Sequence, residues 1–504
     1  MTPAIELIGI DKRFGPVHAN NDVSLAIAPG SIHGIIGENG AGKSTLMSIL
    51  FGFYQADRGE IRVRGQPVKI RSSTDAISHG IGMVHQHFML VDSFTVLENV
   101  ILGAEGGRLI GPALAKARTD LTHLAGEYEL DVDPDAIIGE LPVGLQQRVE
   151  ILKALYKGAD VLILDEPTGV LTPAEADHLF RILEQLRSQG KTVILITHKL
   201  REIMAITDQV SVMRRGALVA NFATKDTNVG ELAEAMVGRR VLLRVEKTPS
   251  KPGDVVLDVK NVTWRDKKGI ARVDNVSLRV RKGEIVGIAG VSGNGQSELL
   301  DVITGITKAT SGQVIFEGED ITALNDPRIL RQRGMAHVPE DRHHRGLITS
   351  FSAAESAILG WQHNPALGKG FRLDRKAVIE QTRRQMEEFD VRPADPLLKS
   401  AKFSGGNQQK IILAREIGSH PDLLVVGQPT RGVDIGAIEF IHRRLIQLRD
   451  QGKAILLVSV ELDEIRSLSD RILVMFAGRM MGERGPDVDE RECGLLMAGV
   501  EQAA

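Results

Sequence analysis

The stretch GIIGENGAGKST, residues 34–45, decides the fold of this 504-residue chain. From Gly37 to Ser44 it fits the pattern G-x-x-x-x-G-K-[ST], between the strand-like SIHGII and a helical pattern. Glycines let backbone N–H groups curl around phosphate oxygens, Lys43 would reach the outer phosphates, and Ser44 would offer a hydroxyl to Mg²⁺. The sequence therefore predicts a phosphate-binding loop rather than a plain glycine turn, with nucleotide contacts from Gly37, Glu38, Asn39, Gly40, Ala41, Gly42, Lys43, Ser44 and Thr45.

The same pattern returns in the second half of the chain. Residues 23–65 align with residues 276–318, and Gln296 stands where the first copy has Lys43. A repeat of this length indicates a duplicated domain rather than a solenoid. We predict a first domain at 1–240, a charged, proline-containing linker at 241–254 and a second domain at 255–499.

Each half alternates short apolar strands with helical patterns. VLIL (161–164) and KTVILITH (191–198) are continuous apolar runs of buried-strand length. Such runs separated by helices favour an α/β fold whose core is a mainly parallel sheet covered on both faces. β-rich alternation before the loop predicts an antiparallel edge, and residues of about 95–160 and 350–420 predict a helical subdomain in each half.

Composition narrows the function classes. Lys and Arg number 62 against 65 Asp and Glu, so no general basic surface drives nucleic-acid binding. The single cysteine, Cys493, cannot form an internal disulfide, which suits a reducing compartment. No apolar run approaches the length that crosses a bilayer, and no signal segment opens the chain. We expect a soluble protein that reaches a membrane only through a partner.

Polar residues at strand ends are the catalytic candidates. Asp165 and Glu166 follow VLIL, where Asp165 would hold Mg²⁺ and Glu166 would act as general base on water. His198 ends the next apolar strand, at the place of a γ-phosphate sensor, and Gln86 ends another and could contact Mg²⁺ or the water. An isolated Asp-Glu pair is often a helix cap, and a histidine at a strand end is often a surface residue. The phosphate loop upstream favours catalytic roles for these residues.

Two further candidates are weaker when taken alone. The run from Ser404 to Gln409 precedes the helical pattern KIILAREI, which is typical of an anion site and also of a plain helix cap. Phe14, in the loop after the first strand, could stack on adenine or pack at the edge of the core, and Trp264 takes the matching place in the second half.

Together these motifs resemble the nucleotide-binding domain of ABC transporters over nearly the whole chain. GENGAGKST resembles the Walker A motif, LILDE the Walker B motif and FSGGNQQ the ABC signature, while Gln86 and His198 fall on the Q-loop and the H-loop. Two such domains without membrane segments resemble the ATPase subunit of bacterial monosaccharide and nucleoside importers. The stretches 82–91 and 428–442 look most like the nucleoside branch, which lipoprotein-type binding proteins serve.

The resemblance implies ATP and Mg²⁺ as cofactors and a set of partners. These are two membrane permease subunits and an extracytoplasmic substrate-binding protein, with the chain peripheral at the cytoplasmic face of the cell membrane and no nucleic acid bound. A ribose- or galactose-type importer is the alternative cargo class. A soluble tandem ABC ATPase acting on ribosomes is a distant alternative, because such proteins usually keep both sites intact and have a long charged linker.

The second half departs from the family pattern at its Walker motifs. Gln296 replaces the lysine, Gly427 the Mg²⁺ aspartate and Gln428 the general base, while Glu340 and Val460 stand at the Q-loop and H-loop positions. In the first half the signature itself departs, as Leu-Pro-Val-Gly-Leu at 141–145.

In the family, each ATP site joins the Walker motifs of one domain to the signature of the other. On that rule the complete motifs of this chain gather in one site and nearly all the departures gather in the other. The resemblance therefore predicts one hydrolytic site and one degenerate site, in which the second half supplies to the hydrolytic site Ser404, Gly405, Gly406, Asn407, Gln408 and, at the D-loop position, Asp434.

Overall fold

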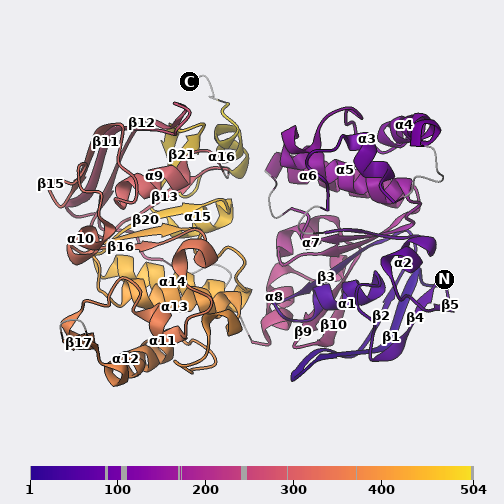
Figure 1. Cartoon of the computed structure of the whole chain (residues 1–504), viewed down its shortest axis with the longest axis horizontal. Coiled ribbons are helices and arrows are strands. Elements are labelled where there is room, and N and C mark those ends of the chain that lie inside the picture. Colours follow the sequence, from indigo (N-terminus) through magenta and orange to yellow (C-terminus); the bar gives the residue numbers. More distant parts are fainter. Residues whose placement is uncertain are drawn as a thin grey trace. The chain divides into compact units, whose positions relative to one another are not determined.

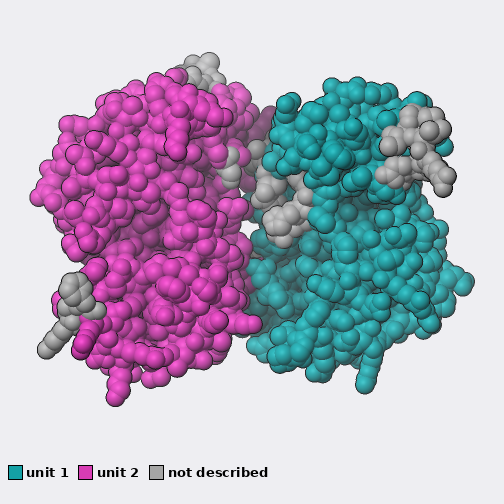
Figure 2. All heavy atoms as spheres, in the orientation of Figure 1, with its two compact units in different colours: residues 1–241 teal, residues 242–504 magenta. Residues whose placement is uncertain are grey.

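The computed structural model describes residues 2–85, 89–103, 110–168, 171, 173–239, 247–291, 293–369 and 372–500. The chain divides into two compact units, residues 1–241 and residues 242–504 (Figure 2). Each unit is described by itself. In the described ranges, no helix has both the length and the apolar character needed to cross a membrane.

The first unit contains two sheets and a set of helices (Figure 1). Its strands are β1 (Ile5–Phe14), β2 (Val17–Ile27), β3 (Ile32–Gly37), β4 (Arg58–Val63), β5 (Gln66–Val68), β6 (Ile81–Val84), β7 (Val161–Asp165), β8 (Thr192–Ile196), β9 (Gln209–Arg214) and β10 (Ala217–Ala223). Its helices are α1 (Lys43–Leu50), α2 (Ser73–Ser78), α3 (Val96–Ile101), α4 (Ile110–Glu127), α5 (Val143–Tyr156), α6 (Pro173–Ser188), α7 (Leu200–Ile206) and α8 (Val229–Val237).

The larger sheet of the first unit has the order β10-β9-β3-β8-β7-β6. Neighbouring strands from β9 to β6 pair in parallel, and only the edge pair β9–β10 is antiparallel. The second sheet, β2-β1-β4-β5, is antiparallel. Because the carboxyl ends of parallel strands share one edge, the residues after β3, β7 and β8 are brought to the same side of the sheet.

One apolar cluster connects the two sheets of the first unit to helix α1. It contains Ile5 of β1, Leu46 of α1 and Ile163 of β7, all fully buried. Burial of each such side chain stabilises the fold by about 1.5–3 kcal/mol, so the helix that follows the phosphate loop is held firmly against the sheet. In Figure 1 the helices α3, α4 and α5 lie on the other side of this sheet from the antiparallel strands.

The second unit repeats this plan. Its strands are β11 (Val255–Arg265), β12 (Ala271–Arg281), β13 (Ile285–Ala289), β14 (Ser311–Phe316), β15 (Glu319–Asp320), β16 (Met335–Val338), β17 (Gly368–Lys369), β18 (Arg372–Leu373), β19 (Leu423–Gly427), β20 (Ala454–Ser459), β21 (Arg471–Phe476) and β22 (Arg479–Arg484). Its helices are α9 (Gln296–Ile303), α10 (Pro327–Gln332), α11 (Ala353–Ala357), α12 (Arg375–Glu388), α13 (Gly405–Ile417), α14 (Ile435–Asp450), α15 (Leu462–Leu468) and α16 (Glu490–Met497).

The sheets of the second unit have the orders β16-β19-β20-β13-β21-β22 and β12-β11-β14-β15. The first is parallel except for the edge pair β21–β22, and the second is antiparallel. The predicted fold class, a mainly parallel sheet with an antiparallel β edge and a helical subdomain in each half, is therefore confirmed.

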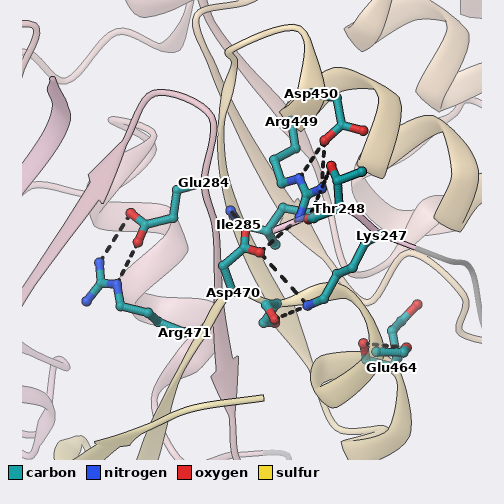
Figure 3. A network of polar contacts seen from close by, with 11 residues as sticks. Lys247, Thr248, Glu284, Ile285, Arg449, Asp450, Glu464, Asp470 and Arg471 are labelled. Carbon is teal, nitrogen blue, oxygen red and sulfur yellow. Dashed lines mark hydrogen bonds and ion pairs between the residues drawn. The ribbon is translucent and has the colours of Figure 1, made fainter. Parts of the chain in front are cut away.

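The chain enters the second unit through a buried polar network (Figure 3). Arg449, at the end of α14, is 1% exposed and donates to the carbonyl oxygen of Thr248 and to Asp470 Oδ1, both at 2.9 Å. Lys247 donates to the carbonyl oxygen of Ser469 and lies within 3.9 Å of Asp470. Residues 247 and 248 of the predicted linker are thus anchored to the second unit.

Candidate active site

The phosphate loop of the first unit runs from the end of β3 to the start of α1. Gly42 caps the helix with φ 99°, and no side chain caps its N-terminal amides. A Cβ at Gly42 would collide with the carbonyl oxygen of Ala19, so a larger residue does not fit. Asn20 Nδ2 donates to the carbonyl oxygen of Gly42 at 3.0 Å from a buried position. The loop is therefore held in a shape that leaves the first amides of α1 open to an anion.

Lys43 is folded back into this loop. Its side chain is buried, and Nζ donates to the carbonyl oxygens of Gly37 at 2.7 Å and Glu38 at 3.1 Å. Burial lowers the pKa of Lys43, while the charges of Glu166 and Asp165 act in the opposite direction. A bound phosphate would replace two neutral carbonyl acceptors by an anion, which is a stronger partner for the ammonium group.

Asp165 closes β7 next to the start of α1. Its carboxyl group accepts a hydrogen bond from the Ser44 hydroxyl. Burial, followed by the charge of Glu166, raises the pKa of Asp165, while the Ser44 hydrogen bond and the charge of Lys43 act in the opposite direction. A hydroxyl and a carboxylate at this spacing are the hard oxygen ligands that Mg²⁺ takes together with nucleotide phosphates. Ser44 and Asp165 therefore fit a magnesium ion.

Glu166 and His198 form a pair at the ends of neighbouring strands. Glu166 Oε1 lies 2.9 Å from His198 Nδ1. The backbone of Glu166 is left-handed, with φ 47°, and its N–H donates to the carbonyl oxygen of Ile196 at 2.8 Å. Burial raises the pKa of Glu166, but the hydrogen bond and charge of His198, together with the charges of Lys43 and Lys199, hold the pKa below its ordinary value. The group is thus kept as a carboxylate, the form that accepts a proton from water.

Gln86 and Phe14 are the two other candidate residues of the first half. Gln86 lies outside the described residues. Phe14 is the last residue of β1 rather than part of a loop, because Phe14 and Val17 pair across the turn to β2. Its ring is 40% exposed and meets Tyr54 edge to face, with ring centroids 5.1 Å apart. An exposed aromatic pair is available for stacking on a base. The sequence does not indicate Tyr54 as a site residue, because only the packing of the folded chain brings it next to Phe14.

The signature motif of the second unit begins helix α13. Ser404 is its cap, and Ser404 Oγ accepts hydrogen bonds from Asn407 N at 3.4 Å and Asn407 Nδ2 at 2.9 Å. A Cβ at Gly405 would lie 2.8 Å from the carbonyl oxygen of Gly432, too close for an alanine. In the first unit, Pro142 precedes α5 as its N-cap residue and makes no side-chain cap hydrogen bond. In the second signature, the serine thus caps the helix and the glycine leaves room for the carbonyl oxygen of Gly432. The first signature has proline and valine at these positions.

The remaining signature candidates face the interior or cap a helix. Gln408 is 5% exposed. Its Oε1 lies 2.8 Å from His343 Nε2, and its Nε2 donates to the carbonyl oxygen of Ser400 at 3.0 Å. Both ends of its amide are therefore occupied within the second unit. Asp434 caps α14 by accepting from Ala437 N at 2.8 Å.

Gln428, the counterpart of Glu166 in the second unit, has the backbone but not the chemistry of Glu166. Gln428 has φ 47°, as Glu166 has, and its N–H donates to the carbonyl oxygen of Val458 at 2.8 Å. Its side-chain Oε1 accepts from the backbone N–H of Val460 at 3.2 Å. A neutral amide replaces the carboxylate, and a backbone amide replaces the imidazole.

Comparison with known proteins shows the family of the chain. The sequence profile of the ABC transporter family matches residues 20–169 and 273–431. The chain is 50% identical over 496 residues to the nucleoside import ATP-binding protein NupA of Lactococcus lactis, covering 98% of both chains. It is 48% identical over 504 residues to the guanosine import ATP-binding protein NupO of Bacillus subtilis, covering 100% of this chain and 98% of that one.

A further relative has a different cargo in its name. The chain is 44% identical over 529 residues to a glucose import ATP-binding protein of Haloferax volcanii, covering 99% of this chain and 96% of the other. The profile match and the full-length identities, together with the phosphate loop and the Glu166–His198 pair, lead to one conclusion. The chain belongs to the ABC transporter family, as an ATP-binding protein with two ABC domains in tandem and an ATPase coupled to transport.

Proposed function

We propose that this chain is the ATP-hydrolysing subunit of an importer that carries nucleosides, with one hydrolytic and one degenerate ATP site. The observation that supports hydrolysis is the 2.9 Å contact between Glu166 and His198, in the unit whose loop also holds Lys43. A carboxylate kept ionised next to a phosphate-binding loop is what a general base for water requires.

In this proposal each candidate side chain of the first unit has a defined role in ATP binding or hydrolysis. Lys43 leaves the two loop carbonyls and binds the outer phosphates of ATP, and Ser44 and Asp165 hold Mg²⁺. The metal, when bound, neutralises charge that develops on the phosphates. Glu166 orients the attacking water and accepts its proton, while His198 fixes the rotamer of Glu166 and faces the γ-phosphate.

The second set of Walker positions lacks these groups. Gln428 accepts no proton, and Gln296 carries no charge for the phosphates. Loss of a general base alone typically lowers a rate by about 10²–10⁴-fold, so this site would not contribute to turnover. The resemblance to the family supports assigning Ser404, Gly405 and Asp434 to the hydrolytic site, with further contacts from Gly406, Asn407 and Gln408 and, in the first half, Gln86.

The cargo assignment depends on the relatives. The two import proteins at 50% and 48% identity are named for nucleosides and for guanosine, and this supports nucleoside cargo for this chain. Sugar import is the second candidate, since the relative at 44% identity is named for glucose. Either cargo implies two permease subunits, an extracytoplasmic binding protein and a peripheral position at the cytoplasmic face of the membrane.

The proposal is tested by reconstituting the full chain with its permeases and binding protein and measuring ATP turnover. We expect guanosine or another nucleoside to stimulate turnover, whereas ribose and glucose leave it at the basal rate. Stimulation by a free sugar alone would keep the mechanism and replace the cargo. Turnover that responds to neither class, in a preparation where no permease co-purifies, would contradict the transport role.

A further inference from the structure

The turn that carries Glu166 is held by side chains from two helices. Besides the backbone bond from Glu166 to β8, the carbonyl oxygen of Pro167 accepts from Gln147 Nε2 at 2.7 Å. The hydroxyl of Thr168 donates to Glu202 Oε1. Gln147 lies on α5 and Glu202 on α7, so elements far apart in the sequence fix consecutive residues of this turn.

The turn needs such support because the backbone of Glu166 is left-handed. A φ of 47° costs free energy for any residue with a side chain, and it persists where the surrounding structure fixes it. Pro167 has no backbone N–H, so its carbonyl oxygen is the backbone group through which a hydrogen bond can hold this residue. The amide of Gln147 makes that bond.

The contact between Gln147 and Pro167 is shielded from water. Gln147 is 2% exposed, and Pro167 is buried. If the amide donor were lost, the carbonyl oxygen of Pro167 would be left buried without this partner, which is unfavourable. The backbone would then have to shift to satisfy that oxygen, and Glu166 would shift with it.

The second unit keeps the glutamine but not its contact. Gln409 takes the place of Gln147 and is 3% exposed, but its Nε2 has no hydrogen-bond partner among the described residues. Arg342 holds the corresponding turn instead, by donating to the carbonyl oxygens of Arg431 at 2.6 Å and Gly432 at 3.5 Å. The glutamine thus holds the turn in the unit whose turn carries a carboxylate.

The glutamate of α7 also changes its partners between the units. Glu202 accepts from the hydroxyls of Thr168 and Thr197. Glu464 takes its place in the second unit, where its Oε1 lies 2.9 Å from His442 Nε2. The supports of the turn therefore differ between the units together with the residue that the turn carries.

We propose that Gln147 is a positioning residue for Glu166: its amide holds the carbonyl of Pro167 and thereby keeps the Glu166 carboxylate in the place where it meets the attacking water. A misplacement of about 1 Å can cost about 100-fold in rate, so a single contact of this kind matters. Gln147 itself takes no part in proton transfer. The inference rests on the proposed function, which makes Glu166 the general base.

The test separates positioning from stability. Gln147→Met removes the amide donor and keeps the length of the side chain. Gln146→Met makes the same change at the preceding residue of α5, whose Nε2 donates to the carbonyl oxygens of Ile138 at 3.2 Å and Leu141 at 2.9 Å. ATP turnover by the full chain with its permeases, and urea unfolding, are measured for both variants.

The two variants should differ in turnover. We expect kcat to fall by about tenfold in Gln147→Met, with the KM for ATP changed by less than about twofold, because the phosphate loop is not touched. Gln146→Met should keep the kcat of the wild type even though it loses stability. Loss of stability alone would then not account for the lower kcat of Gln147→Met.

A double-mutant cycle shows whether Gln147 acts through Glu166. In the Glu166→Gln background the base is already absent, so we expect Gln147→Met to cause no further decrease in single-turnover hydrolysis. A residue that only supported the fold would lower the rate by the same factor in both backgrounds.

The outcomes separate this inference from the proposed function. The kcat of the wild type in Gln147→Met, an equal decrease in Gln146→Met, or the same factor of loss in the Glu166→Gln background would each overturn the inference and leave hydrolysis at the first site intact. Full turnover in Glu166→Gln would contradict the proposed function and overturn the inference with it.

Discussion

At the scale of single residues, Gly42 and Gly40 have different roles in one loop. Both have positive φ, 99° and 81°. A Cβ at Gly42 would collide with the carbonyl oxygen of Ala19 and approach Asn20 Nδ2 at 2.8 Å, while a Cβ at Gly40 would meet nothing within 4 Å. Gly42 is thus required by packing and by backbone conformation, and Gly40 by conformation alone.

This difference gives a matched pair of variants. Gly40→Ala should cost about 1–2 kcal/mol of stability, the typical cost of a left-handed backbone for a residue with a side chain. Gly42→Ala should cost more and should abolish ATP binding, because the backbone of Ala19 must move and the first turn of α1 with it. Urea unfolding and equilibrium ATP binding measure both effects. Equal losses in the two variants would contradict this account of the loop.

The positions of most site residues could be predicted from motif spacing, because parallel strands place their carboxyl ends at one edge. Lys43, Asp165, Glu166 and His198 follow from this rule. The partner of Phe14 could not be predicted, since Tyr54 approaches it only through packing. The position of the Glu340 side chain against Gly427 could not be predicted either, because the space that it fills exists only where β19 and the residue after β16 come together.

At the scale of secondary-structure elements, β3 supplies more than the entry to the loop. His33 is the second residue of β3 and is 3% exposed, and its Nε2 lies 2.7 Å from Ser211 Oγ of β9. Burial lowers the pKa of His33 to about 4. The strand that carries the phosphate loop therefore contains a histidine that folding keeps neutral.

The stability of the first unit should therefore decrease in acid. The pKa of His33 is lower in the folded than in the unfolded chain, so the unfolded chain binds more protons between pH 6.5 and about 4, and stability is lost as pH falls through that range. From pH 7.5 to 5 the loss should be about 2 kcal/mol. Urea unfolding at the two pH values should show this loss in the wild type and a smaller one in His33→Gln, whose amide can still donate to Ser211. If His33→Gln loses as much stability as the wild type between the two pH values, groups other than His33 cause the loss.

At the scale of the whole molecule, the two units repeat one plan but differ at one pair of corresponding arginines. Arg449 and Arg187 stand at corresponding places, each bonded to an aspartate, Asp470 at 2.9 Å and Asp208 at 3.1 Å. Only Arg449 also binds Thr248, and its side chain is 1% exposed against 34% for Arg187. The duplication could be predicted from the repeated motifs, but this anchor could not, because a lone Arg in a helix gives no signal of burial.

The anchor predicts unequal effects of equivalent changes. Arg449→Met should destabilise the second unit by about 3 kcal/mol, because buried Asp470 loses the guanidinium 2.9 Å away and keeps only Lys247, at 3.9 Å, as a cationic neighbour. Arg187→Met should cost at most about 1 kcal/mol. Urea unfolding measures the difference, and trypsin cleavage after Lys247 should become faster only in Arg449→Met. Similar costs and similar cleavage in both variants would show that the linker contact is not stabilising.

The central claim is that ATP is hydrolysed at one site, with Glu166 as its base. The most direct measurement is ATP turnover by the full chain with its permeases, for the wild type, Glu166→Gln, and Glu166→Gln combined with Gln428→Glu. We predict a loss of at least about 100-fold in Glu166→Gln and no recovery in the double variant, whose second site still lacks the charge of Lys43. Turnover that persists in Glu166→Gln, or that returns with Gln428→Glu, would contradict the claim.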